Sequence, residues 1–209
     1  MPAAVPESLD SLLERIAANT PTPRGGTVSA ICGALSAALS RMVANLARGK
    51  QGYEDVQSEL AAIESRGKAL QRRFLDLAEA DAKAYDQVVA AMALPKARDA
   101  DRAARKEAMQ AAYQRATEVP MDTIRACLDA LELAKLAAEK GNRSAITDAG
   151  VAALLAQAAM RGAALNVRIN LAAIADAAWR SHRETDLESL LESGASLAHA
   201  VDDLVDARM

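Results

Sequence analysis

Apolar residues in this sequence recur every three or four positions over long stretches, and this spacing constrains the fold more than any other feature. Alanine and leucine dominate these stretches, aromatic residues make up only 2% of the chain, and β-branched runs bounded by turn residues are missing. The pattern is typical of amphipathic helices and argues against a sheet. We therefore expect an all-α fold, a multihelical up-and-down bundle with long helices, in one domain that spans residues 1–209.

Prolines and glycines indicate where the helices end. Residues 20–26 hold two prolines and two glycines, so we expect a joint there. Pro120 suits the first turn of a new helix and Gly141 suits the end of one, so residues 141–150 form a second joint. The expected helices cover residues 7–19, 26–47, 53–94, 99–118 and 120–140, a segment that opens at residue 147, and an amphipathic C-terminal segment over residues 187–204.

The composition excludes several classes of function. The net charge is -3, without the basic excess that nucleic-acid binding needs. The sequence has no apolar run of about 18 to 20 residues and no signal-peptide pattern, so we expect a cytoplasmic chain that does not span a membrane. Cys32 and Cys127 lie far apart, and His182 and His199 lack the spacing of metal ligands, so we predict neither a disulfide nor a metal site.

Two stripes run along the expected helix over residues 26–47. The apolar stripe is predicted to face the core, and it consists of Val28, Ile31, Leu35, Leu39, Met42 and Leu46. The second stripe contains only small residues, namely Gly26, Ser29, Gly33, Ser36 and Ser40. Small side chains on one face let another helix pack unusually closely, or let a ligand approach the backbone, and the sequence leaves both interpretations open.

Asp81 interrupts the apolar seam of the next helix. The heptad positions of that seam are Tyr53, Val56, Leu60, Ile63, Gly67, Leu70, Phe74, Leu77, Asp81, Ala84 and Val88. A strict heptad turns Asp81 inward, where a bare carboxylate costs several kcal/mol unless it is paired or hydrogen-bonded. The alternative is that helix drift of about 20° per heptad has carried this position toward solvent.

Two amides share one face of the apolar helix that opens at residue 147. Gly162, Asn166 and Asn170 follow one another at intervals of four residues. Buried amides need hydrogen-bond partners, so Asn166 and Asn170 either line a polar site or join this helix to a neighbour.

Several short motifs, taken in order, resemble a known enzyme family. They begin with Thr20-Pro-Thr-Pro-Arg-Gly-Gly-Thr-Val-Ser-Ala, Met42-Val-Ala-Asn-Leu, Gly49-Lys50 and Tyr53-Glu-Asp-Val. They continue with Leu94-Pro-Lys, Ala116-Thr-Glu-Val-Pro, Gly141-Asn, Thr147-Asp-Ala-Gly-Val-Ala-Ala-Leu-Leu and Leu165-Asn-Val-Arg-Ile-Asn-Leu. Over residues 8–171 the chain is similar to the formimidoyltetrahydrofolate cyclodeaminase/methenyltetrahydrofolate cyclohydrolase family. The resemblance implies a helical homodimer that acts on the one-carbon bridge of a folate-like small molecule, with a tetrahydrofolate derivative as substrate and no cofactor.

The resemblance also implies a set of site residues. Asp148 or Asp81 would transfer the proton, and Lys50 would anchor a carboxylate of the substrate. Amide side chains would bind the pterin, and the N-terminal amides of a helix would add an anion site. The implied substrate-binding residues are Arg24, Gly25, Gly26, Asn45, Glu79, Asn142, Asn166 and Asn170. We expect the two joints to surround one polar pocket that bears a carboxylate and holds no metal.

The chain departs from the family pattern at several positions of this set. Arg24 replaces the first of three glycines, Ala47 and Arg48 replace a threonine and an apolar residue, and Glu79 replaces the first of two aspartates. A lysine cluster is thinned to Lys50, and Thr147 replaces a serine. The sequence does not choose between the two reactions. It also leaves open a divergent member that acts on another amidine-like or imine-like substrate, and a non-catalytic helical interaction protein.

Overall fold

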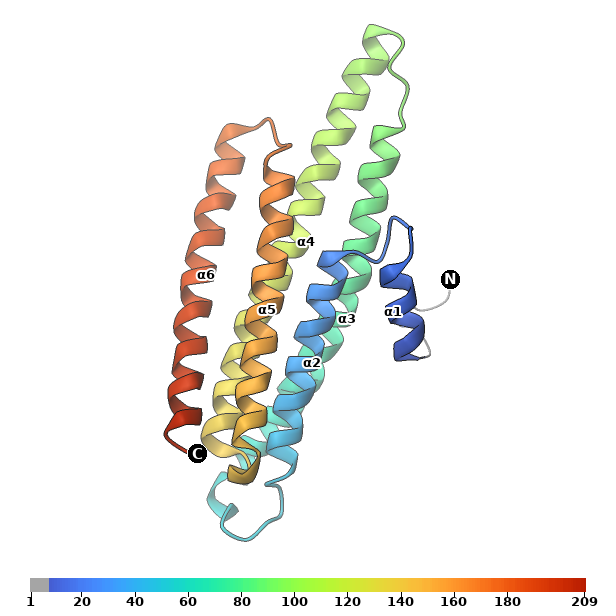
Figure 1. Ribbon diagram of the computed structural model, residues 1–209. Coiled ribbons are helices and arrows are strands. Elements are labelled where there is room, and N and C mark those ends of the chain that lie inside the picture. Colours follow the sequence, from blue (N-terminus) through green and yellow to red (C-terminus); the bar gives the residue numbers. More distant parts are fainter. Residues whose placement is uncertain (1–7) are drawn as a thin grey trace.

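The computed structural model describes residues 8–209 and contains only helices and turns within that range, which confirms the all-α expectation. The elements are α1 (Leu9–Ala17), α2 (Gly25–Asn45), η1 (Glu54–Val56), α3 (Gln57–Met92), α4 (Asp99–Lys140), η2 (Arg143–Ala145), α5 (Ile146–Leu171) and α6 (Ala177–Asp206). In Figure 1, α2 and α5 lie side by side in front of α3 and α4, and α6 flanks α4 and α5. The hairpin of α3 and α4 projects beyond the other helices.

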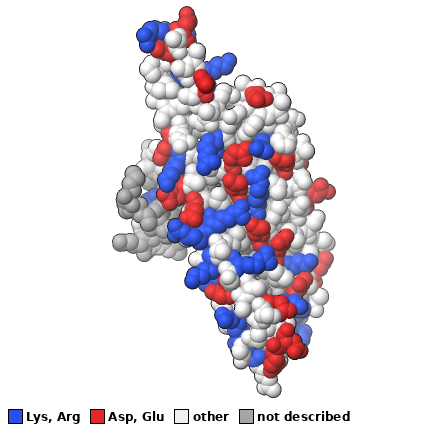
Figure 2. Space-filling model, turned by 180° about the vertical axis from the view of Figure 1, so that it is seen from behind, with Lys and Arg blue, Asp and Glu red and all other residues white. Residues whose placement is uncertain are grey.

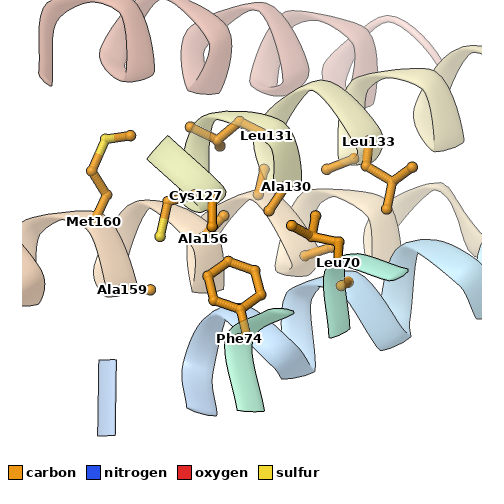
Figure 3. Close-up of a cluster of buried hydrophobic side chains, with 14 of the residues drawn as sticks. Leu70, Phe74, Cys127, Ala130, Leu131, Leu133, Ala156, Ala159 and Met160 are labelled. Carbon is orange, nitrogen blue, oxygen red and sulfur yellow. The ribbon is translucent and has the colours of Figure 1, made fainter. Parts of the chain in front are cut away.

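Small residues let the helices of the core pack closely. Phe74, the single phenylalanine, is fully buried among side chains of α3, α4 and α5 (Figure 3). A Cβ at Gly33 would overlap the Phe74 ring, and a Cβ at Gly162 would overlap the Ser29 hydroxyl. The small-residue stripe of α2 therefore packs against α3 and α5, as one of the two interpretations predicts.

The prediction that the apolar stripe of α2 faces the core is wrong for half of its residues, whereas Ile31 and Leu39 are partly buried against the core. Leu35, Met42 and Leu46 are exposed, while the small residues on the opposite side of the helix are buried. The physical reason is that the Phe74 ring and its neighbours pack close to the α2 backbone. Only the face of α2 with small residues leaves room for them. An exposed apolar stripe also follows α5, through Val151, Leu154, Leu165 and Ile169.

The prediction of a helix break before Pro120 is also wrong, because α4 is continuous from Asp99 to Lys140. Proline has no N–H, so the carbonyl of Ala116, four residues earlier, loses its usual helical partner. The Asn170 Nδ2 atom donates a hydrogen bond of 2.7 Å to this carbonyl from α5. A donor from the neighbouring helix thus takes the place of the missing backbone N–H.

Two helices meet a length and hydropathy criterion for crossing a membrane, namely Gly25–Asn45 and the segment Arg143–Leu171. About half of each apolar window is buried inside the bundle (50% and 44%). Both are core helices whose outward-facing residues include an apolar stripe. The residues of this stripe raise the hydropathy of the two helices and also form the exposed apolar face.

Candidate active site

The joint between α1 and α2 places Arg24 over α3. The Arg24 Nε atom donates to the carbonyl of Pro21 at 2.6 Å. Its guanidinium carbon lies 4.2 Å from the centre of the Tyr85 ring, within the range of a cation–π interaction. Tyr85 is four residues after Asp81 on α3, so both side chains share one face of that helix. Arg24 thereby lies over the turn of α3 that follows Asp81.

Asp81 is turned inward, as the heptad predicts, and it is hydrogen-bonded. Its Oδ2 atom accepts a bond of 3.0 Å from the Thr27 hydroxyl. Burial raises the pKa of this carboxyl, and hydrogen bonds from Thr27 oppose that shift in part. The carboxylate lies against Gly26, where any Cβ would overlap it. The first turn of α2 and the middle of α3 therefore form a half-buried carboxylate site.

The amides of α5 reach this end of the bundle. A Cβ at Gly25 would lie 3.8 Å from Asn166 Nδ2, so Asn166 borders the start of α2. Asn166 donates to the carbonyl of Gly162 at 3.0 Å within its own helix. The amide N–H of Asn170 is already engaged with Ala116. Asn166 is thus the amide that lies beside Gly25, whereas Asn170 joins α5 to α4.

Glu79 lies outside this cluster. Its carboxylate pairs with Lys83 at 2.5 Å on the surface, and the hydrogen bond from Lys83 lowers its pKa. Two residues along a helix correspond to about 200° of rotation, so Glu79 and Asp81 point to nearly opposite sides of α3.

The other predicted site residues gather at the opposite end of α2. Asn142 donates through Nδ2 to the carbonyl of Leu46 at 2.9 Å, and it caps η2 through Ser144. Lys50 lies in the turn after α2, and Asp148 lies in the first turn of α5. Asn45 donates to Glu64 at 2.8 Å, in a network that includes Arg41 and in which the Arg41 hydrogen bond lowers the pKa of Glu64.

The expectation of one pocket around both joints is therefore wrong for a single chain. Gly26 and Asn45 are 19 residues apart on α2, and Asp148 and Asn166 are 18 apart on α5. At about 1.5 Å per residue, the two intervals correspond to about 27 to 29 Å. One chain holds an Asp81 cluster at one end, formed by Arg24, Gly25, Gly26, Thr27, Asp81, Tyr85 and Asn166. It holds a Lys50 cluster at the other end, formed by Asn45, Lys50, Asn142 and Asp148.

Comparison with known proteins identifies the family. Residues 8–189 match the formiminotransferase-cyclodeaminase family. The chain belongs to this family. It is 38% identical to a methenyltetrahydrofolate cyclohydrolase of Methylorubrum extorquens, over 97% of this chain and 98% of that protein. It is 29% identical to the formimidoyltransferase-cyclodeaminase of Sus scrofa, of which it spans 40%.

A solved structure shares the fold of this family member. Formiminotetrahydrofolate cyclodeaminase from Thermotoga maritima superimposes with a TM-score of 0.86 and 32% sequence identity, over 96% of both chains. The family resemblance that the motifs indicate is thus confirmed.

Two residues of the site are not predicted from the sequence. Thr27, the hydrogen-bond partner of Asp81, belongs to the motif after Pro23 but has no distinctive spacing. Tyr85 lies one helical turn after Asp81, and this spacing is a signal that could have identified it.

Proposed function

We propose that this chain hydrolyses 5,10-methenyltetrahydrofolate to 10-formyltetrahydrofolate, with Asp81 as the general base. The observation that carries the proposal is the half-buried Asp81 carboxylate, which Thr27 holds against the first turn of α2. The match to a protein named methenyltetrahydrofolate cyclohydrolase over nearly the full length of both chains supports the choice of reaction.

The reaction suits a carboxylate with a raised pKa. The methenyl bridge is an amidinium cation, so an anionic carboxylate attracts it. Water adds to the bridging carbon while Asp81 accepts one of its protons, which forms a neutral tetrahedral adduct. The bond from this carbon to N5 then breaks as N5 gains a proton, and the adduct hydroxyl loses its proton as the formyl group forms on N10. The net change is uptake of one water and release of one proton.

Asp81 fits the role of base better than Asp148. A general base works best when its pKa is close to the working pH, and burial raises the pKa of Asp81 toward that range. Asp148 lies in the first turn of α5, at the end of the bundle away from Arg24 and Asn166. Beside Asp81, Arg24 and the N-terminal amides of α2 supply donors for the carbonyl and ring nitrogens of a pterin.

Cyclodeamination of formimidoyltetrahydrofolate is the second candidate, because the structural relative from Thermotoga maritima is named for it. There N10 attacks the formimino carbon and ammonia leaves from a related tetrahedral adduct. The same carboxylate can transfer the protons of this reaction.

We propose further that the chain functions as a homodimer through the exposed apolar face of α2 and α5. Leu35, Leu165 and Ile169 are 53%, 66% and 72% exposed, and their helices lie side by side (Figure 1). The opposite side of the bundle carries interleaved acidic and basic residues (Figure 2), including the Arg73–Asp129 pair between α3 and α4. A long apolar stripe on one side of an otherwise polar bundle is typical of a protein interface.

A two-fold axis across the middle of this face would complete the site. The two helices would then meet their copies in antiparallel orientation, because an axis perpendicular to the helices reverses their direction and pairs the patch with itself. The Asp81 cluster of one chain would lie against the Lys50 cluster of its partner. Lys50 and Asn142 could then contact the substrate that Asp81 attacks, with Lys50 near a substrate carboxylate.

The absorbance of the substrate gives the decisive test. Purified protein should accelerate the loss of the near-ultraviolet absorbance of 5,10-methenyltetrahydrofolate, and Asp81→Asn should remove most of that acceleration, about 100-fold or more. Asp148→Asn distinguishes the two candidate bases and should retain more activity than Asp81→Asn. No acceleration by the unaltered protein, with formimidoyltetrahydrofolate also unreactive, would refute the proposal.

Mixing two inactive variants tests the shared site. Asp81→Asn and Lys50→Met chains, inactive alone, should regain about a quarter of the activity when mixed, because half of the dimers then hold one intact site of two. If no activity is recovered although exchange of subunits is verified, the two clusters do not form one site across the dimer interface. The cytoplasmic location and the lack of a cofactor or nucleic-acid partner remain part of the proposal, on the composition alone.

A further inference from the structure

A cavity of about 390 Å³ lies at the base of the bundle, away from the Asp81 cluster. Its walls come from η1, the end of α4, η2 and the residues after α6, and they include Tyr53, Val56, Glu139, Lys140, Arg143 and Arg208. Four segments that are distant in the sequence thus meet around one hollow.

The lining of this cavity is strongly basic. Three cationic side chains, Lys140, Arg143 and Arg208, face one carboxylate, Glu139. Glu139 lies 3.9 Å from Lys135 on its own helix, so a cation outside the lining partly offsets its charge. Three other acids lie on the elements around the cavity. Glu54 on η1 accepts a hydrogen bond of 2.8 Å from the backbone N–H of Gly52, and Asp55 follows it. Glu59 on α3 has a pKa that is lowered by hydrogen bonds from Ser58 and its own backbone and by attraction to Lys140. Among the residues that line the cavity, three cations face one acid, and this excess favours an anion.

Hydrogen-bond donors in the cavity remain available. Among residues 8–209, neither the Arg143 guanidinium nor the Lys140 ammonium group has an acceptor within hydrogen-bond distance. The Arg208 guanidinium donates one hydrogen bond of 2.6 Å to the carbonyl of Ala138, and its other N–H groups can donate to a ligand. The Tyr53 hydroxyl accepts from the backbone N–H of Arg143 at 3.1 Å, which leaves its own hydrogen to donate. Most other arginines of the bundle pair with acids, as Arg73 does with Asp129.

We propose that this cavity binds a multivalent oxyanion, at a site separate from the Asp81 carboxylate. Two guanidinium groups, an ammonium and a phenol suit a ligand with several oxygens on one centre or on neighbouring centres. Phosphoryl groups and a chain of carboxylates share this chemistry. A bound ligand would join the ends of α4 and α6 to η1 and η2, and so stabilise the joint that also holds Asn142.

Calorimetric titration of the full chain tests the site, at constant ionic strength, with inorganic pyrophosphate in one arm and tri-L-glutamate in the other. We expect saturable binding of at least one ligand and a matching rise in melting temperature. Binding of pyrophosphate alone would identify a phosphoryl ligand, and binding of triglutamate alone a carboxylate ligand.

Variants locate the binding. Arg143→Gln and Lys140→Gln should each weaken it about tenfold or more, because each removes a charged donor. Lys68→Gln, an equal change of charge on the exposed side of α3, should leave binding intact, and so should Asp81→Asn. No saturable binding of either ligand would overturn the proposal. Equal binding by the Arg143→Gln variant, with its helical circular dichroism unchanged, would also overturn it.

Discussion

Burial of the Asp81 carboxylate has a cost to the fold, which the proposed role as general base would explain. Burial disfavours its charged form, and the Thr27 hydroxyl offsets only part of that penalty. Gly26 opposite gives the carboxylate its space. A polar group held at such a cost in an apolar seam is typical of a functional residue.

Replacing Asp81 by asparagine should separate stability from activity. A raised pKa means that the stabilising contribution of the protonated form is present at low pH and is lost as pH rises through the folded-state pKa. Asp81→Asn should therefore melt at a higher temperature than the unaltered chain at about pH 7.5, and the difference should shrink toward about pH 4. Thermal melts at both pH values check this, and a difference that grows toward acid would contradict it.

For the unaltered chain, kcat/KM should fall on the acid side at a pH above the ordinary aspartate range.

Gly26 and Gly25 provide a matched pair of substitutions. A Cβ at Gly26 overlaps the Asp81 carboxylate, which can move because it ends a side chain, whereas a Cβ at Gly25 has 3.8 Å to Asn166. Gly26→Ala should therefore lower kcat about tenfold to a hundredfold while the melting temperature changes little. Gly25→Ala should behave like the unaltered chain. Equal kinetic losses in both variants would mean that the position of Asp81 is not what matters.

Among the elements, α4 shows how one helix depends on another. Its central Pro120 is buried and leaves the Ala116 carbonyl without a helical partner. The Asn170 bond from α5 satisfies that carbonyl. The pair ties α4 to the part of α5 that carries Asn166.

A double-mutant cycle measures this dependence. Asn170→Ala should destabilise the chain by about 1 to 3 kcal/mol, because it strands a buried carbonyl. In a Pro120→Ala background the restored backbone N–H should reduce that loss by about half or more. Asn166→Ala, whose bond stays within its own helix, is the control and should cost less. Urea denaturation of the four chains gives the coupling energy, and additive losses would exclude the proposed link.

The sequence predicts the helices better than their orientation. Residues 20–26, Gly141 and the heptad through Asp81 locate the joints and the inward carboxylate correctly, because these signals depend on local backbone geometry. The apolar stripe of α2 is misassigned because periodicity reveals two faces without saying which one packs against Phe74. Pro120 is misassigned because the carbonyl that it leaves without a partner is satisfied by Asn170, which lies 50 residues later.

At the scale of the whole molecule, the bundle has two different sides. Charged residues interleave on the side of α3 and α4, and exposed apolar residues follow α2 and α5 on the other (Figures 1 and 2). The two predicted clusters of site residues lie at opposite ends of α2. In the proposed dimer, a second copy in antiparallel orientation would bring them together.

A charge placed on the apolar face should disrupt both assembly and activity. Ile169→Glu puts a carboxylate on a residue that is 72% exposed in one chain, so the monomer should still fold, but the carboxylate would be buried in the dimer without a partner. Sedimentation should show the unaltered chain at twice its mass of 21.9 kDa and the variant near that mass. Val89→Glu, on the projecting part of α3, changes an apolar residue that is 43% exposed and lies away from the face, and this variant should stay dimeric and active. A dimeric Ile169→Glu chain would move the interface elsewhere, whereas a monomer with full activity would show that one chain carries the complete site.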